Sequence, residues 1–304
     1  LLTEIVDKLH RGKAMSIYVS LMNFAGIFGP SIGVAVYKIY ITSVSNPDLF
    51  TALRMPFIFL AIVSLAALIS SLSLPKGRRN STIHDKSRFS LHGIKNSLKK
   101  LSAEAKRSIY TIYVNGIVNG FGMGIVNTSA IVYIIQEVVK DPSGLGLLYS
   151  ISGVVTITSS ILAGHLTDKI GKRKDLIIIG YLISRPVFFL IPFVKNLWML
   201  IGLYSLATLS FGIGMPLMRA LQADLTPSEV RGTIFGLQQT FFNSGTAVGA
   251  LAGGYLCAAV SGINFEFFGL TVNGIAIPFW ITAILGISTT ILFWTFVTEP
   301  ERKF

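Results

Sequence analysis

The sequence has little charge, one cysteine and four histidines. Cys257 alone excludes an intramolecular disulfide, and the histidines are not spaced as metal ligands. Only 13% of the 304 residues are charged, whereas 52% are hydrophobic; a soluble domain would have about 25% charged residues. The composition predicts an integral membrane protein without a cofactor or metal.

Long apolar runs occur throughout the chain. A helix needs about 20 apolar residues to cross a bilayer. Eight stretches meet this requirement: 14–37, 53–74, 109–135, 144–167, 176–194, 197–222, 233–260 and 276–297. We therefore expect an all-α membrane protein with eight transmembrane helices.

The basic residues are unevenly distributed between alternate connections. The net charge is +12, and 21 lysines and arginines fall on one set of connections against four on the other. Because cytoplasmic loops are enriched in Lys and Arg, both termini and the loop 75–108 are predicted to be cytoplasmic. The positive charge is therefore a topology signal, and we expect no nucleic-acid binding.

The polar, basic segment 75–108 is the main linker. Within it, residues 89–107 carry apolar side chains close to helical spacing. This pattern fits an amphipathic helix on the anionic inner leaflet. A solvated linker is the alternative.

The first and seventh spans repeat one pattern at an offset of 220 residues. Both begin with Arg-Gly seven residues after an acid, and both continue with an asparagine and two glycines. The matched pairs are Glu4 and Asp224, Arg11 and Arg231, Gly12 and Gly232, Asn23 and Asn243, Gly29 and Gly249, and Gly33 and Gly253. Such repeats are common in secondary transporters, whose substrate site lies between the repeated halves.

The offset also predicts the domain organisation. If the seventh span is the fifth helix of a six-helix half, residues 109–304 form a complete C-terminal half. Residues 1–74 are then the remainder of an N-terminal half, and 75–108 join the two. The partner half would begin about four helices upstream of residue 1 by the length needed per span.

Three motifs resemble those of the major facilitator superfamily. The stretch "GHLTDKIGKRK", with Gly164, Asp168, Lys169, Gly171, Lys172 and Arg173, resembles the family's loop between the second and third helices of a half. "ADLTPSEVRG", with Asp224, Pro227, Arg231 and Gly232, is similar to the loop between the fourth and fifth. "GIFGPSIG", with Gly26, Gly29, Pro30 and Gly33, is similar to a helix-packing motif of drug antiporters. In the chain, Val34 replaces that motif's final glycine.

The resemblance implies the last eight of twelve helices and a conformational latch at the first motif. An acid can pair with a helix N-terminus, while bases bind C-terminal carbonyls and lipid phosphate. We expect Asp168 to be the latch acid and the start of the seventh span, near Arg231, to be its partner. A plain positive-inside turn is the alternative.

Polar residues inside the spans are candidates for a substrate pathway. Glycines 116, 120 and 124 give the third span one small face, beside a face of amides. These amides line an aqueous cavity or join helices by hydrogen bonds. The candidates are Asn115, Asn119, Asn127, Gln238, Gln239, Asn243 and Asn23.

Two arginines are the remaining candidates. Arg185 is the deepest charge in the chain, and it either serves function or pairs structurally. Arg219 either contacts an anionic substrate or anchors its helix at the inner interface. No carboxylate lies deep in any predicted span, so a proton-binding acid is expected in helices that precede the chain.

These features favour a secondary transporter that moves a small organic solute by alternating access, as proton-coupled efflux. The alternatives are a nutrient uptake permease of the same superfamily and a truncated membrane protein without transport. An enzyme is not expected, because the interfaces of the predicted spans have no clusters of His, Asp and Glu. The expected partners are the lipid bilayer of the plasma membrane, a small-molecule substrate and, with proton coupling, protons.

Overall fold

The computed structural model describes residues 28–72, 101–139, 143–170, 172–226, 231–267 and 269–299. Most of the first predicted span, with Asn23 and Gly26, lies outside these residues. The linker and nearly all of its predicted amphipathic helix also lie outside them. The side chains of 164–170 are not described either, although these residues are helical.

The described chain is almost entirely helical, as the sequence predicts. Residues 28–43 form helix, and Ser102 caps the third predicted span, which begins at Ala103 instead of 109. The further helices are α3 (Leu49–Leu72), α5 (Ala103–Tyr133), η1 (Ile134–Val138), α6 (Ser143–Ile170), α7 (Arg173–Leu190), η2 (Ile191–Phe193), α8 (Leu197–Leu225), α9 (Arg231–Val260) and α10 (Ala276–Phe296).

A short β-hairpin, which was not predicted from the sequence, joins α9 to α10. Strands β1 (Asn264–Phe267) and β2 (Leu270–Asn273) pair antiparallel. Gly269 at the turn has a φ of 76°, a conformation that glycine adopts without steric cost. Ring contacts of Phe265 and Phe267 with Trp280 hold the hairpin against the start of α10.

Six helices of the described chain are long and apolar enough to cross a membrane. They run over Leu49–Ser70, Ala103–Val138, Gly144–Ala163, Arg173–Phe193, Leu197–Leu225 and Ala276–Phe296. The 30-residue α9, the seventh predicted span, is long enough as well. It is less apolar because Gln238, Gln239 and Asn243 lie in its middle.

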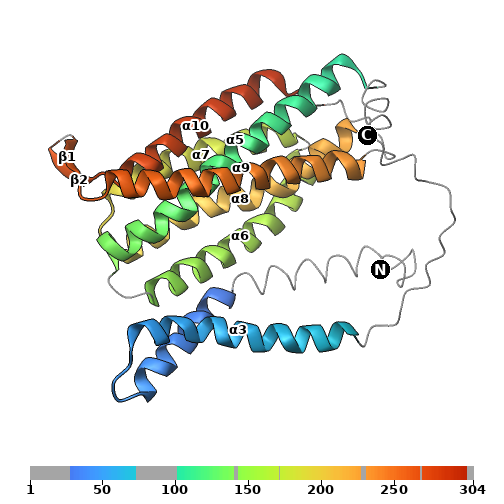
Figure 1. Ribbon diagram of the computed structural model, residues 1–304. Helices are drawn as coiled ribbons and strands as arrows, with labels where there is room; N and C mark the ends of the chain where they lie inside the picture. The colour runs from blue at the N-terminus through green and yellow to red at the C-terminus, as the bar shows by residue number, and fades with distance from the viewer. Residues whose placement is uncertain are drawn as a thin grey trace. The chain divides into compact units, whose positions relative to one another are not determined.

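The chain divides into two compact units, each of which is described by itself. Of the described residues, the first unit contains 28–72 and 143–153. In it, the hydroxyl groups of Ser31 and Ser150 are hydrogen-bonded. The second unit contains 101–139 and 154–299, and its helices α5, α7, α8, α9 and α10 form one bundle (Figure 1).

Glycines join α5 and α9 backbone to backbone, in the most extensive contact between two described helices. A Cβ at Gly249 would overlap the carbonyl group of Phe121, and one at Gly253 would lie 2.9 Å from the Cα of Ile125. On α5, a Cβ at Gly124 would overlap the carbonyl oxygen of Thr246. The pair therefore tolerates no side chain at these glycines without moving apart.

The repeat partners of these glycines have open surroundings in the described chain. Nothing lies within 4 Å of a Cβ built on Gly29, and Gly33 meets only the Cβ of Pro56 at 3.9 Å. The sequence repeat is therefore not accompanied by the same packing in the described residues.

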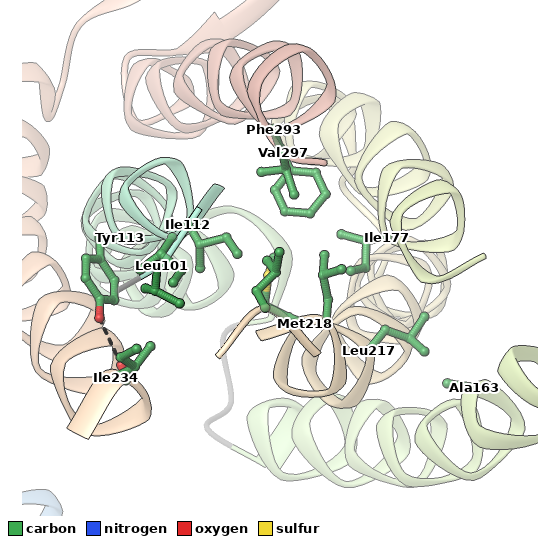
Figure 2. Packing of buried hydrophobic residues seen from close by; sticks show 13 residues of the cluster. Leu101, Ile112, Tyr113, Ala163, Ile177, Leu217, Met218, Ile234, Phe293 and Val297 are labelled. Carbon is green, nitrogen blue, oxygen red and sulfur yellow. Dashed lines mark hydrogen bonds between the residues drawn. The ribbon is translucent and has the colours of Figure 1, made fainter. Parts of the chain in front are cut away.

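Buried hydrophobic residues from six helices, α5 to α10, pack together at the end of the bundle where α5 begins (Figure 2). The hydroxyl of Tyr113 donates a hydrogen bond of 3.4 Å to the carbonyl of Ile234 there. The cluster comprises Leu101, Ile109, Ile112, Tyr113, Ala163, Ile177, Leu217, Met218, Leu221, Leu225, Ile234, Phe293 and Val297.

The glycine contact makes a direct prediction about stability. Gly249→Ala forces the α5 and α9 backbones apart and should lower the free energy of unfolding by about 1–3 kcal/mol, as overpacking does. Gly254, on the same helix, has nothing within 4 Å of a Cβ placed on its backbone. Gly254→Ala should therefore be neutral or stabilise by up to about 1 kcal/mol, because alanine has the higher helix propensity.

Thermal unfolding of both variants in detergent measures the difference. Equal melting temperatures for the two variants would contradict a close backbone contact at Gly249.

Candidate functional site

A cavity of about 420 Å³ lies inside the second unit, between α5, α7, α8, α9 and α10. Its wall combines amides and hydroxyls with aromatic and methionine side chains, including Phe188, Phe211, Phe235, Phe242, Met123 and Met215. Two arginines line it, Arg185 and Arg219, and no aspartate or glutamate is among its described lining residues. The cavity is therefore amphiphilic, with a positive charge that no acid of its described wall balances.

Arg185 comes from α7, near the middle of the bundle, and is 9% exposed. Its Nη2 donates to Oδ1 of Asn119 at 2.7 Å. Its guanidinium carbon lies 4.7 Å from the ring centre of Tyr181, one turn earlier on the helix. Gly286 of α10 leaves room for the side chain, since a Cβ there would lie 2.5 Å from Cδ of Arg185.

The two amides of α5 are part of the same network. Nδ2 of Asn115 donates to the carbonyl of Thr289 at 3.0 Å, which ties α5 to α10. Asn119 donates to the carbonyl of Asn115 at 2.9 Å and presents its own Oδ1 to Arg185. Both predicted functions of these amides, cavity lining and helix joining, are thus combined in single side chains.

The other predicted pathway residues differ in position. Gln238 and Gln239 of α9 line the cavity, as does the exposed Arg219 of α8. Asn243 is exposed and accepts a 3.0 Å hydrogen bond from Gln239, without lining the cavity. Asn127 is exposed and does not line it either.

Several polar members of the site were not predicted from the sequence. Tyr181 contacts both Arg185 and Asn115. Gln222 lines the cavity with a buried Nε2 that has no hydrogen-bond partner in the described residues. Gln222 was not predicted because it lies at the end of a predicted span, where a polar residue is also typical of the membrane interface. Thr289, whose carbonyl accepts the hydrogen bond of Asn115, was not predicted because the run Ser288–Thr290 is compatible with an ordinary apolar span.

A second polar cluster lies at one end of the bundle, where α7 begins and α8 and α10 end. The carboxylate of Glu299 accepts hydrogen bonds from the backbone N–H groups of Arg173 and Lys174, at 2.8 and 3.0 Å. The guanidinium of Arg173 forms an ion pair with Asp224 of α8. An acid thus occupies the positive N-terminus of α7, but it is Glu299, which was not among the predicted site residues.

Arg231 binds carbonyls in the same cluster. Its Nη2 donates to the carbonyl of Ala223 at 2.9 Å and to that of Thr226 at 3.4 Å, where α8 ends. Nζ of Lys172, the residue just before α7, lies 3.9 Å from Oδ2 of Asp175. Gly232 has nothing within 4 Å of a Cβ.

The remaining motif residues are described only in part or not at all. Gly164, Asp168 and Lys169 are helical without described side chains, and Gly171 and Pro227 lie outside the described residues. The expected pairing of Asp168 with the start of α9 therefore stays a prediction. Pro30 lies near the start of the described helix 28–43.

Fold and cavity together define a multi-pass helical membrane protein with a polar cavity between its helices. The chain belongs to the Major Facilitator Superfamily, whose family model matches residues 112–304. The resemblance that the motifs indicated is thereby confirmed.

Two bacterial proteins illustrate the relationship. The quinolone resistance protein NorA of Staphylococcus aureus is 28% identical over 197 residues, which cover 65% of this chain and 47% of NorA. The uncharacterized MFS-type transporter YceJ of Bacillus subtilis is 29% identical over 161 residues, 53% of this chain and 38% of YceJ. The chain thus matches less than half of the length of these relatives.

Solved structures share the fold at low identity. The D-xylose–proton symporter aligns with a TM-score of 0.67 and 18% identity, over 98% of this chain and 66% of that chain. A bacterial homolog of the lysosomal transporter Spinster aligns with a TM-score of 0.52 and 15% identity, over 67% of this chain and 45% of that chain.

The Glu299 contact predicts a pH-dependent stability. Burial raises the pKa of Glu299 above its ordinary value of 4.5, and the charges of Asp175 and Asp224 act in the same direction, against the hydrogen bond from Lys174. The folded protein therefore takes up this proton at a higher pH than the unfolded chain. The stability of the wild type relative to Glu299→Gln should rise as the pH falls from neutral towards the ordinary pKa of 4.5.

Melting temperatures of both proteins across this pH range measure the effect. Glu266→Gln, which replaces an exposed acid of β1, is the control. Its melting temperature should equal that of the wild type across this range. A constant difference between wild type and Glu299→Gln would contradict the raised pKa.

Proposed function

We propose that this chain is part of a secondary transporter that moves a small organic solute across the plasma membrane by alternating access. The observation that carries the proposal is the amphiphilic cavity inside a bundle of apolar helices. A polar cavity at membrane depth is costly unless it serves a solute pathway, and membership in the superfamily supports the same conclusion.

We favour efflux of an amphiphilic compound as the direction. The support is the relationship with a protein named for quinolone resistance and a cavity wall rich in aromatic and methionine side chains. Uptake is the second candidate, because one solved structure with this fold is a sugar–proton symporter. At 18% identity that likeness concerns the fold alone.

Proton coupling requires a titratable group within the membrane. The cavity wall contains no carboxylate among the described residues, so the proton-binding acid of a coupled transporter would come from another part of the protein. The arrangement we propose has residues 109–304 as one six-helix half and 1–74 as part of the other.

We assign the latch to the end cluster of α7, α8 and α10. Glu299, Arg173 and Asp224 join three helix ends by contacts that a sliding helix would break, and Asp168, near the end of α6, would add an acid. The excess of basic residues at this end supports a cytoplasmic location, with both termini on that side.

The transport proposal is tested by quinolone accumulation. In a bacterial strain without its own efflux pumps, cells that express the protein should accumulate less norfloxacin, a fluorescent quinolone, than cells with an empty vector. A protonophore should abolish the difference if efflux is proton-driven. Increased accumulation would instead support uptake, and no change at matched expression would support a chain without transport.

The latch proposal is tested by Asp168→Asn. Removal of the charge biases the equilibrium between the two transport states, so the initial efflux rate should fall by roughly fivefold or more, at unchanged membrane expression. Glu266→Gln, at the opposite end of the bundle, is the matched acid-to-amide control and should keep the wild-type rate. A wild-type rate in Asp168→Asn would exclude a latch role for this acid.

A further inference from the structure

Arg185 is a buried cation without a described carboxylate near it. The side chain is 9% exposed, and its only described charge contact with a titratable group is with Tyr181. The acids of the helices around it, such as Glu104, Glu137 and Asp224, lie at helix ends. A guanidinium does not lose its proton in a protein, so the positive charge persists in the bundle.

The hydrogen bonds of Arg185 are also incomplete. A guanidinium has five N–H donors, and the bond to Asn119 uses one of them. Its Nε is buried and has no hydrogen-bond partner among the described residues. Since buried charges are normally paired and hydrogen-bonded, the unpaired donor indicates that the site is built for a further group.

That group has a defined place. Arg185 lines the cavity together with Asn119 and Ser184, so a molecule in the cavity can reach its guanidinium. Because Gly286 has no side chain, α10 can pack directly against the side chain of Arg185 and hold it at the cavity wall. The fork of the guanidinium matches the two oxygens of a carboxylate, which it can bind through two parallel hydrogen bonds.

The rest of the cavity selects the body of the ligand. Aromatic and methionine side chains from α5, α7, α8 and α9 face the space around the polar network. Such a wall favours a planar apolar or aromatic body over a sugar. Arg219, exposed on the same wall, adds to the positive potential.

We infer that the cavity binds amphiphilic organic anions, with a carboxylate at Arg185 and an aromatic body against the apolar wall. This inference rests on the proposed function, because it names the substrate class of the same cavity. Asn119 positions the arginine through its hydrogen bond, and Tyr181 through its ring. A neutral ligand of the same shape would leave the charge unpaired and bind more weakly.

Equilibrium binding to the purified chain in lipid nanodiscs tests the inference without any need for transport. The probes are tritiated 2-naphthoate and its neutral amide, 2-naphthamide, which share one ring system. The wild type should bind the carboxylate roughly tenfold to a hundredfold more tightly than the amide, the range expected for hydrogen bonds to a charged group.

Variants then assign the preference to one residue. Arg185→Gln should lose the preference and bind 2-naphthamide within about twofold of the wild type. Arg185→Lys keeps the charge without the fork and should show an intermediate preference. Arg54→Gln, at an exposed arginine of α3 in the other unit, is the control and should bind both probes as the wild type does.

Four results would overturn the inference. The wild type could bind both probes equally, or it could fail to bind 2-naphthoate. A folded Arg185→Gln variant could lose both probes to the same extent. The preference for the carboxylate could also disappear in Arg219→Gln alone. If Arg185→Gln does not fold, the test rests on two measurements: the preference of the wild type for 2-naphthoate, and the weaker preference expected of Arg185→Lys. Norfloxacin efflux without a 2-naphthoate preference would contradict this inference alone, whereas a preference without any transport would contradict the proposed function alone.

Discussion

The backbone contact between α5 and α9 is the constraint on which the cavity depends. Lipid tails are as apolar as leucine, so helices in a membrane gain little from burying apolar surface and associate through close packing. Glycines at 120 and 124 on α5 and at 245, 249 and 253 on α9 let the two backbones touch. The two helices therefore have one well-defined separation and rotation.

That rotation sets the direction of the amides. Asn115 and Asn119 directly precede Gly116 and Gly120, and neighbouring residues of a helix point about 100° apart. With the glycine face against α9, the amide face is turned towards α7 and α10, where it meets Arg185 and Thr289. The packing face and the polar face of α5 therefore follow from one sequence pattern, an Asn-Gly pair that recurs after four residues.

The sequence predicts the helices better than their ends. Apolar runs define the spans, but α5 begins six residues before the predicted 109, since Glu104, Lys106 and Arg107 continue the helix beyond the apolar run. The hairpin was missed because its phenylalanines do not alternate with polar residues over enough positions. Glu299 was missed because an acid after the last span resembles any solvated tail, and only the fold brings it to α7.

The depth of Arg185 was readable from the sequence, but its role depended on neighbours that are distant in the chain. Asn119 is 66 residues away, and Gly286 lies on the last helix. The same helix α7 carries the end cluster at Arg173 and the cavity arginine twelve residues later. A rigid shift of α7 that breaks the bonds of Glu299 would also move Arg185 relative to Asn119. The proposed latch and the proposed binding site therefore share helix α7, and under these proposals occupation of the binding site would change the free energy of the latch.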